Sequence, residues 1–311
     1  MWRKGANHQL ETLPFGISHL HARPTKPFTF RLPRCRNIHT VAQDPGAIHV
    51  ATALAHERSG CDFTAQVLFS APAFKQVVSR DEWLAARKDL LEKEKELTRA
   101  NDKLTEQRRA LPMVKVDKQY TFHDENGAAV TLGDLFQGKP QLIVYHFMFG
   151  PDEEIGCHGC SHTADALPDV RHLRFKDTNL VCVSRAPPEK LQAFKKANGW
   201  TWPWYSSQGT DFNYDLHATI DESVCPVEMN FRTKQEMEAR GKRWWTGDVP
   251  GFSVFYKRDG GDVFHTYSTW ERGGDKIMPT LQLLDMTPLG RRLDKYGPAE
   301  FRLKYEYDES V

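Results

Sequence analysis

The sequence predicts an α/β domain in which a mixed β-sheet is flanked by helices. From residue 114 onward, short apolar runs typical of strands alternate with stretches of helical period. Their order is hairpin, strand, helix, strand, helix, insertion, hairpin and helix, which indicates a single layered sheet rather than a bundle or a sandwich. A long charged segment before this region has the period of one N-terminal helix. We find no internal repeat.

The composition excludes several classes of protein. The 311 residues are 40% hydrophobic and 27% charged, with a net charge of +1. This balance suits a globular chain and gives no global field that would attract nucleic acid or anionic lipid. No apolar run reaches the roughly 18 residues of a membrane span, and six cysteines are too few for a disulfide-stapled secreted scaffold. We therefore expect no nucleic-acid partner, no membrane partner and a cytoplasmic location.

Residues 1–75 differ from the rest of the chain. The first 60 residues carry eight basic side chains against three acidic ones, with no period of 2 or 3.6. Acid-poor, Arg-bearing N-termini are typical of mitochondrial presequences, but those form amphipathic helices, which four prolines between residues 14 and 33 oppose. We expect a disordered extension or a misplaced start of the coding sequence, with mitochondrial targeting as the alternative.

The segment from residue 79 to residue 111 is predicted to form one long helix. Ser79 and Glu82 have the spacing of a capping box, in which each side chain accepts a hydrogen bond from the other residue's backbone N–H. Trp83 and the leucines that follow lie along one helical stripe, and Pro112 ends the run. The many charges between residues 88 and 109 are expected to form its solvated face, and contact with a partner helix is the alternative.

The strands and helices of the domain follow this helix. The turn sequence at residues 124–127 predicts a leading β-hairpin with strands at 120–122 and 130–132. Further strands are predicted at 141–149, 179–184, 252–256 and 263–267, and helices at 187–198 and 276–285. Prolines at the start of the first of these helices and Gly199 after its end agree with these bounds.

The sharpest chemical feature is Cys157-His158-Gly159-Cys160, a few residues beyond the strand at 141–149. Two cysteines three apart at a helix start bring both sulfurs to one helix end, where the dipole and free N–H groups stabilise a thiolate. His158 adds positive charge when it is protonated. In an alternating strand and helix pattern this motif indicates a thioredoxin-like dithiol. We assign Cys157 as nucleophile and Cys160 as resolving thiol, without a cofactor and with a protein or small-molecule disulfide or thiol as substrate.

Pro250 is a second candidate site residue. Asp248-Val249-Pro250-Gly251 immediately precedes the apolar strand at 252–256. Thioredoxin-like folds place a cis-proline at this point, beside the dithiol, where its neighbours can pair with a bound substrate chain. We therefore predict a cis bond between Val249 and Pro250, although only about 5–6% of X–Pro bonds are cis.

The same segment admits metal binding as an alternative. Cysteine and histidine pairs are an accepted ligand set for zinc, and thiolate with imidazole also suits copper. A distant histidine at position 146, 217 or 265 is a further possible ligand. The four ligands of this alternative site are Cys157, His158, Cys160 and His162.

Four stretches carry a family resemblance: VVSRDEWLAARKDLLEKEKELTRANDKL, QLIVYHFMFGPDEEIGCHGCS, SSQGTDFNYDLH and PGFSVFYKRDGGDVFHTYSTWERG. In this order they resemble the thioredoxin-like family catalogued as domain of unknown function 899, from about residue 77 to residue 292. The resemblance implies a thioredoxin-like mixed sheet flanked by helices, and it names no particular reaction. The family's Gly-Cys-x-x-Cys-Ser pattern is matched by Gly156, Cys157, Cys160 and Ser161.

These observations predict three parts of the chain and one main function. The parts are the basic extension at 1–75, a thioredoxin-like domain with its N-terminal helix at 76–292, and a C-terminal tail at 293–311. The predicted function is dithiol–disulfide exchange through Cys157 and Cys160. The alternatives are a copper or zinc protein and a non-catalytic thioredoxin-fold accessory protein in small-molecule metabolism.

Overall fold

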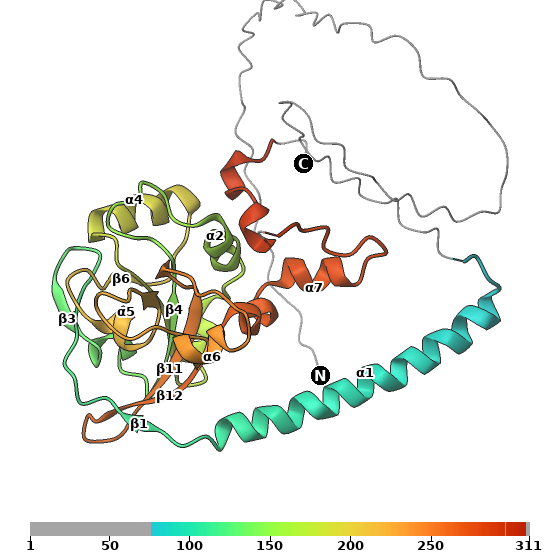
Figure 1. Ribbon diagram of the computed structural model, residues 1–311, viewed down its shortest axis with the longest axis horizontal. Helices are drawn as coiled ribbons and strands as arrows, with labels where there is room; N and C mark the ends of the chain where they lie inside the picture. The colour runs from blue at the N-terminus through green and yellow to red at the C-terminus, as the bar shows by residue number, and fades with distance from the viewer. Residues whose placement is uncertain (1–75, 296, 309–311) are drawn as a thin grey trace, which may run out of the picture. The chain divides into compact units, whose positions relative to one another are not determined.

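The computed structural model describes residues 76–295 and 297–308 (Figure 1). The expectations for residues 1–75 lie outside the described residues. An eight-stranded sheet forms the centre of the described part, with the strand order β1-β12-β11-β4-β5-β6-β2-β3. Its strands are β1 (Val114–Lys115), β2 (Thr121–His123), β3 (Ala129–Thr131), β4 (Gln141–His146), β5 (Thr178–Ser184), β6 (Trp204–Ser206), β11 (Gly251–Lys257) and β12 (Val263–Trp270).

The four central strands have the topology of a thioredoxin fold. Strand β4 pairs in parallel with β5 on one side and antiparallel with β11 on the other, and β11 continues antiparallel into β12. Helix α2 (His158–Asp165) follows β4, α4 (Pro188–Asn198) follows β5, and α7 (Pro279–Asp285) comes after β12. The predicted thioredoxin-like mixed sheet is therefore confirmed.

Apart from α1 (Arg80–Arg109), the helices and strands outside this core are short. Strands β2 and β3 form the predicted leading hairpin. The insertion between β6 and β11 forms two small two-stranded sheets. The remaining elements are η1 (Asp134–Phe136), α3 (Val170–Arg174), α5 (Phe212–Asp215), β7 (Thr219–Ile220), β8 (Glu228–Met229), β9 (Arg232–Thr233), α6 (Lys234–Glu238), β10 (Gly247–Asp248), η2 (Glu271–Ile277), η3 (Gly297–Glu300) and η4 (Lys304–Glu306).

Side chains on the two faces of β4 belong to two separate cores, because successive residues of a strand point to opposite faces. Tyr145 packs on the face that holds Cys160, Phe147 and Phe252. Val144 packs on the other face, in a cluster with residues from β2, β5 and α5. The sheet therefore has a buried face on each side, and the face with Tyr145 carries the cysteine motif.

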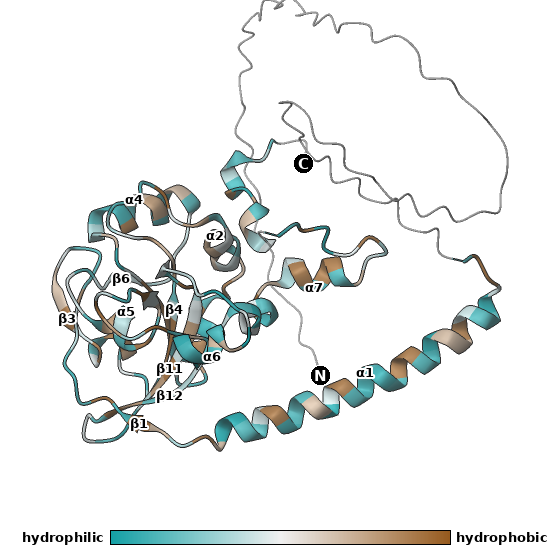
Figure 2. Ribbon diagram, in the orientation of Figure 1, coloured by the Kyte–Doolittle hydropathy of each residue, from teal (hydrophilic) through white to brown (hydrophobic). Residues whose placement is uncertain are grey.

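Helix α1 (Arg80–Arg109) is the predicted long helix. The capping box between Ser79 and Glu82 is present, and charged pairs such as Arg87–Glu94 lie along the surface of the helix. No residue of α1 is buried. Figure 2 shows hydrophobic residues, in brown, interspersed among hydrophilic ones along the ribbon of α1. None of the helices in the described part of the chain has the length and apolar character needed to cross a membrane.

Candidate functional site

Cys157 stands at the start of α2, where the loop from β4 turns into the helix. It is the residue that caps the helix N-terminus, and its own backbone N–H donates to the Met148 carbonyl at 3.1 Å. Its carbonyl accepts the Ser161 N–H at 2.8 Å and the Ser161 hydroxyl at 2.9 Å. These bonds fix the first turn, so that the free N–H groups of the helix end face the Cys157 sulfur.

The two thiols lie in different environments. Cys157 is half-buried, whereas Cys160 is 2% exposed, and both are free thiols. A hydrogen bond from the Cys160 thiol, helped by the N–H groups of Cys160 and Gly159, lowers the pKa of Cys157 from 9.0 to about 7, against an opposing effect of burial. Burial raises the pKa of Cys160 well above its ordinary value, and the neighbouring Cys157 adds to this. At neutral pH one sulfur is therefore ready to ionise while the other keeps its proton.

Tyr145 lies beneath the cysteine pair. Its ring stacks on Phe252 with centroids 4.6 Å apart, and its hydroxyl donates to the Cys160 carbonyl at 3.4 Å. The same hydroxyl interacts with the Cys160 thiol and partly opposes the rise in that thiol's pKa. Tyr145 was not predicted as a site residue, because a tyrosine in a buried strand is ordinary. The one signal in the sequence is that Tyr145 lies two positions before Phe147. Both side chains therefore lie on the same face of the sheet, in the core that holds Cys160 of α2.

Gly156 makes the approach to Cys157 possible. A β-carbon at this position would lie 2.6 Å from the Phe147 ring and 2.9 Å from the Phe194 ring. Both rings belong to the core that also holds Cys160. Only glycine fits at this position without a steric clash. The two rings therefore fix the position of the backbone just before α2 begins.

Pro250 lies at the same end of the sheet, but the predicted cis bond is wrong. Every peptide bond in residues 76–295 and 297–308 is trans. The chain stays extended through this point, because β10 pairs with β7 up to Asp248 and Gly251 already pairs with His146 in β4. Val249 is held between them by its N–H, which donates to the Ala218 carbonyl at 2.9 Å.

The two histidines of the motif region point away from a common metal position. His158 Nε2 lies 3.8 Å from Glu306 Oε2. His162 stacks on Phe301 with ring centroids 4.1 Å apart, and both of its ring nitrogens are buried without a hydrogen-bond partner. Burial lowers the pKa of His162, although Asp165 opposes this effect.

The set Cys157, His158, Cys160 and His162 therefore does not fit a metal site in this arrangement. Within the described ranges, no three Cys, His, Asp or Glu side chains come close enough to hold a metal ion. His146, one of the possible distant ligands, is buried and bonds through Nε2 to the Ser253 hydroxyl at 2.8 Å.

The C-terminal segment at 297–307 packs directly on α2. Leu303 is 1% exposed and belongs to the same core as Cys160. Lys304 forms an ion pair with Asp165 at 3.2 Å, and the Ala299 backbone nitrogen lies 3.2 Å from where a β-carbon of Gly159 would be. These contacts lie beyond the domain boundary predicted at residue 292, because a single leucine in a polar tail gives no periodic signal.

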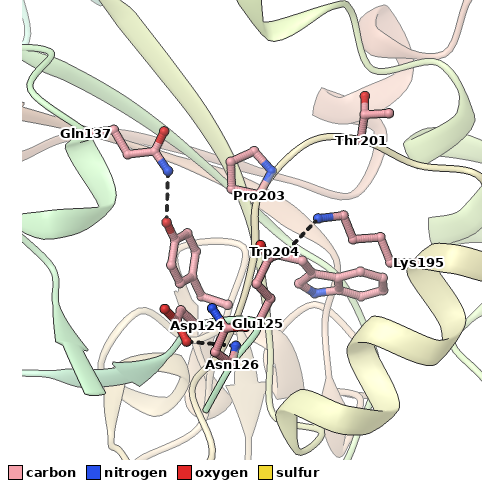
Figure 3. A pocket seen from close by; sticks show the side chains of 9 residues that line it. Asp124, Glu125, Asn126, Gln137, Lys195, Thr201, Pro203 and Trp204 are labelled. Carbon is pink, nitrogen blue, oxygen red and sulfur yellow. Dashed lines mark hydrogen bonds and ion pairs between the residues drawn. The ribbon is translucent and has the colours of Figure 1, made fainter. Parts of the chain in front are cut away.

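A polar hollow lies elsewhere on the surface, beside β6 and the β2–β3 turn. Figure 3 shows Lys195 paired with Glu125 at 3.5 Å and Gln137 donating to the Tyr205 hydroxyl at 3.0 Å. None of the side chains lining it is a cysteine or a histidine, so it lacks the thiol and imidazole groups that are present at the start of α2. It is lined by Asp124, Glu125, Asn126, Gln137, Lys195, Thr201, Pro203, Trp204 and Tyr205.

The chain belongs to the family described as "Bacterial protein of unknown function (DUF899)", whose model matches residues 72–307. This confirms the family expected from the sequence. No curated protein matches the chain.

Among solved structures, the chain is similar to the Xanthomonas campestris bacterioferritin comigratory protein, described for its alkyl peroxide reduction activity. The identity is 14% over 52% of this chain and 90% of that one, with a TM-score of 0.32. A Xylella fastidiosa PrxQ mutant matches at 11% identity over 56% and 94%, with a TM-score of 0.33. BsSco, a member of the Sco family of cytochrome c oxidase assembly proteins, matches at 16% identity over 56% and 94%, with a TM-score of 0.31.

Proposed function

We propose that this protein is a thioredoxin-like thiol–disulfide oxidoreductase that acts through Cys157 and Cys160. The observation that carries the proposal is a pair of free thiols at the start of one helix, of which Cys157 is partly accessible and Cys160 is buried. The opposite shifts of their two pKa values agree with it. An exchange catalyst needs one accessible thiolate to attack and one protected thiol to resolve. The half-buried Cys157 and the buried Cys160 meet these two requirements.

The reaction moves two electrons from the dithiol to a disulfide. The Cys157 thiolate attacks one substrate sulfur, a mixed disulfide forms, and the first substrate thiolate leaves and takes a proton from water. Cys160 then attacks the Cys157 sulfur and its proton passes to the second substrate thiolate. The Cys157–Cys160 bond forms as the mixed disulfide breaks. A thiol co-reactant runs the same steps in reverse and resets the dithiol.

Three neighbours support this chemistry. The Tyr145 hydroxyl lies against Cys160, where it can stabilise the thiolate that forms during resolution. His158 lies inside the motif, and its positive charge, when present, favours the Cys157 thiolate. Pro250 lies at the same end of the sheet, and we assign it the role of positioning the start of β11, where Gly251 pairs with His146 of β4.

The test is disulfide turnover in the full chain and two serine variants. We expect Cys157→Ser and Cys160→Ser each to abolish turnover, with Cys160→Ser accumulating a mixed disulfide on Cys157. The matched control is Cys182→Ser, because Cys182 is buried in the middle of β5 and burial raises the pKa of its thiol. Turnover that survives both active-site substitutions contradicts the proposal.

The reduction potential of the pair gives an independent test. We expect a value between about −120 and −270 mV, the range of known exchange catalysts, in a redox-buffer titration read by alkylation and mass spectrometry. A disulfide that resists reduction below about −300 mV is structural and favours the non-catalytic scaffold. The absence of any Cys157–Cys160 disulfide in every buffer contradicts the redox proposal.

A further inference from the structure

We propose that the Cys157–Cys160 dithiol serves low-molecular-weight disulfides and thiols and excludes protein chains. This inference rests on the proposed exchange function and names its substrate class. It follows from what covers the surface around the dithiol, where a protein substrate would have to dock.

The two residues between the cysteines are each contacted by the chain's own C-terminal segment. The His158 ring faces Glu306, with 3.8 Å between Nε2 and Oε2. Gly159 lies against the Ala299 backbone, so closely that a β-carbon would be 3.2 Å from its nitrogen. In a dithiol open to protein partners these two positions would be part of the contact surface. Here the C-terminal segment contacts both positions and narrows the surface left to a partner, with 39% of the His158 side chain still exposed.

The C-terminal segment is held in place by several contacts with α2 and the core. Leu303 is 1% exposed within the core that holds Cys160, and the Phe301 ring stacks on His162. Lys304 adds an ion pair with Asp165 on the last turn of α2. Lifting the segment would return the buried Leu303 side chain to water, which is unfavourable.

The second docking route, strand addition beside Pro250, is also occupied. A bound peptide in an extended conformation needs free backbone groups at the edge it joins. The Val249 N–H already donates to the Ala218 carbonyl at 2.9 Å. Asp248 and Gly247 pair with β7, and the Asp248 carboxylate is held by Arg185 at 2.7 Å. A peptide therefore cannot pair with the Val249 N–H or with the edge of β10 that β7 already occupies.

A small disulfide meets neither obstacle. Cys157 remains half-buried rather than enclosed, so one sulfur of a compact molecule can approach it. The reduced protein and one small disulfide then yield the protein disulfide and two small thiols. A low-molecular-weight thiol supplies the two electrons that reset the pair.

The experiment compares two oxidants on the reduced full chain. Oxidised glutathione is the small substrate and insulin, read by precipitation of its B chain, is the protein substrate. We expect Cys157 to be oxidised by glutathione disulfide at a rate about a hundredfold above the rate with insulin, the scale of loss when a reacting group is held out of position. Comparable rates overturn this inference and leave the exchange function standing. Loss of both reactions, with Cys157 still open to alkylation, overturns the exchange function itself.

A paired variant shows whether the cover is the cause. Glu306→Ala removes the contact with His158 and the bond from the Leu303 N–H at 2.9 Å, while leaving the Leu303 side chain in the core. We expect a higher rate with insulin and an unchanged rate with glutathione disulfide. Tyr305→Ala is the matched control, because Tyr305 is 52% exposed in the same segment. An insulin rate that stays at background in Glu306→Ala contradicts the contact of Glu306 with His158 as the barrier.

Discussion

Helices α1 and α2 are stabilised in opposite ways. Helix α1 has 30 residues, closes its first turn with its own capping box and buries none of its side chains. Helix α2 has eight residues, has no side-chain cap and buries four of them. A helix of eight residues is not stable by itself in water, since most isolated helices shorter than about 12–15 residues are marginal. The long helix is therefore specified by its neighbours in sequence, and the helix with the dithiol is specified by the rest of the fold.

The contacts that hold α2 come from segments far apart in the chain. Phe147 and Phe194 lie against Gly156, just before α2 begins. Ala299 and Leu303 pack against α2 itself. Damage at any of these distant positions should reach the cysteines, whereas damage to α1 should stay local.

The largest effect is expected from Leu303→Ala. Removing a fully buried leucine side chain leaves a cavity against α2 and costs about 2–5 kcal/mol in the free energy of unfolding. Urea unfolding measures this loss, and the Cys157 alkylation rate should change with it. Leu283→Ala is the control, because Leu283 is 63% exposed in α7. Equal stabilities of the two variants would contradict the role given to the C-terminal segment.

Gly156→Ala comes next. The added methyl group meets the Phe147 and Phe194 rings, and overpacking of this kind costs about 1–3 kcal/mol. Because the rings must move, the start of α2 shifts and the pKa of Cys157 should move with it. Gly138→Ala tests backbone strain alone, since Gly138 has φ +78° and open space around it. A Gly156→Ala protein with unchanged stability and unchanged Cys157 pKa would contradict the close packing.

The third prediction concerns pH. The pKa of Cys157 is about 7, below the ordinary 9.0, chiefly because the Cys160 thiol donates a hydrogen bond to it. Iodoacetamide alkylation of Cys157 should therefore rise through a midpoint near pH 7, and Cys160→Ala should move the midpoint upward. Between pH 7 and pH 9 the unfolded chain binds more protons at Cys157 than the folded protein does. The Cys157 thiolate therefore stabilises the reduced folded protein increasingly as the pH rises through this window, and this contribution is lost as the pH falls toward 7. A midpoint that stays near 7 in Cys160→Ala would assign the shift to the helix end instead.

The smallest effect is expected from Ser79→Ala in α1. Loss of the cap costs about 1 kcal/mol of helix stability and frays the first turn, which amide hydrogen exchange detects. Ser79→Thr keeps a hydroxyl that accepts from the Glu82 N–H and donates to the Glu82 carboxylate, and it should behave as the original. Neither change should alter the alkylation of Cys157. An altered rate would show that α1 and α2 are coupled after all.

This contrast also explains what the sequence could predict. Strands β4, β5 and β11 and helix α4 lie within a few residues of their predicted bounds, because each carries its own period and its own end signals. The cysteine motif was located by spacing alone. Strand β6 and the pairs β7–β10 and β8–β9 are only two or three residues long and exist through their partners, so local patterns do not reveal them.

The site was predicted only in part, for the same reason. The cysteines were found, but the Val249–Pro250 bond is trans because β10 and β11 hold that segment extended. Tyr145 and Leu303 contact α2 through the fold and not through proximity in sequence. Such contacts depend on which elements meet, and a sequence analysis of one chain does not show this.

The position of Leu303 has a consequence for synthesis of the protein. Cys160 leaves the ribosome about 140 residues before the leucine that completes its core, which at about 5–20 residues per second is a delay on the order of ten seconds. During that time both thiols are on a nascent chain that lacks part of its native shield. The dithiol is thus among the last features of this protein to mature, and a stop codon upstream of residue 303 would leave it without its closing contact.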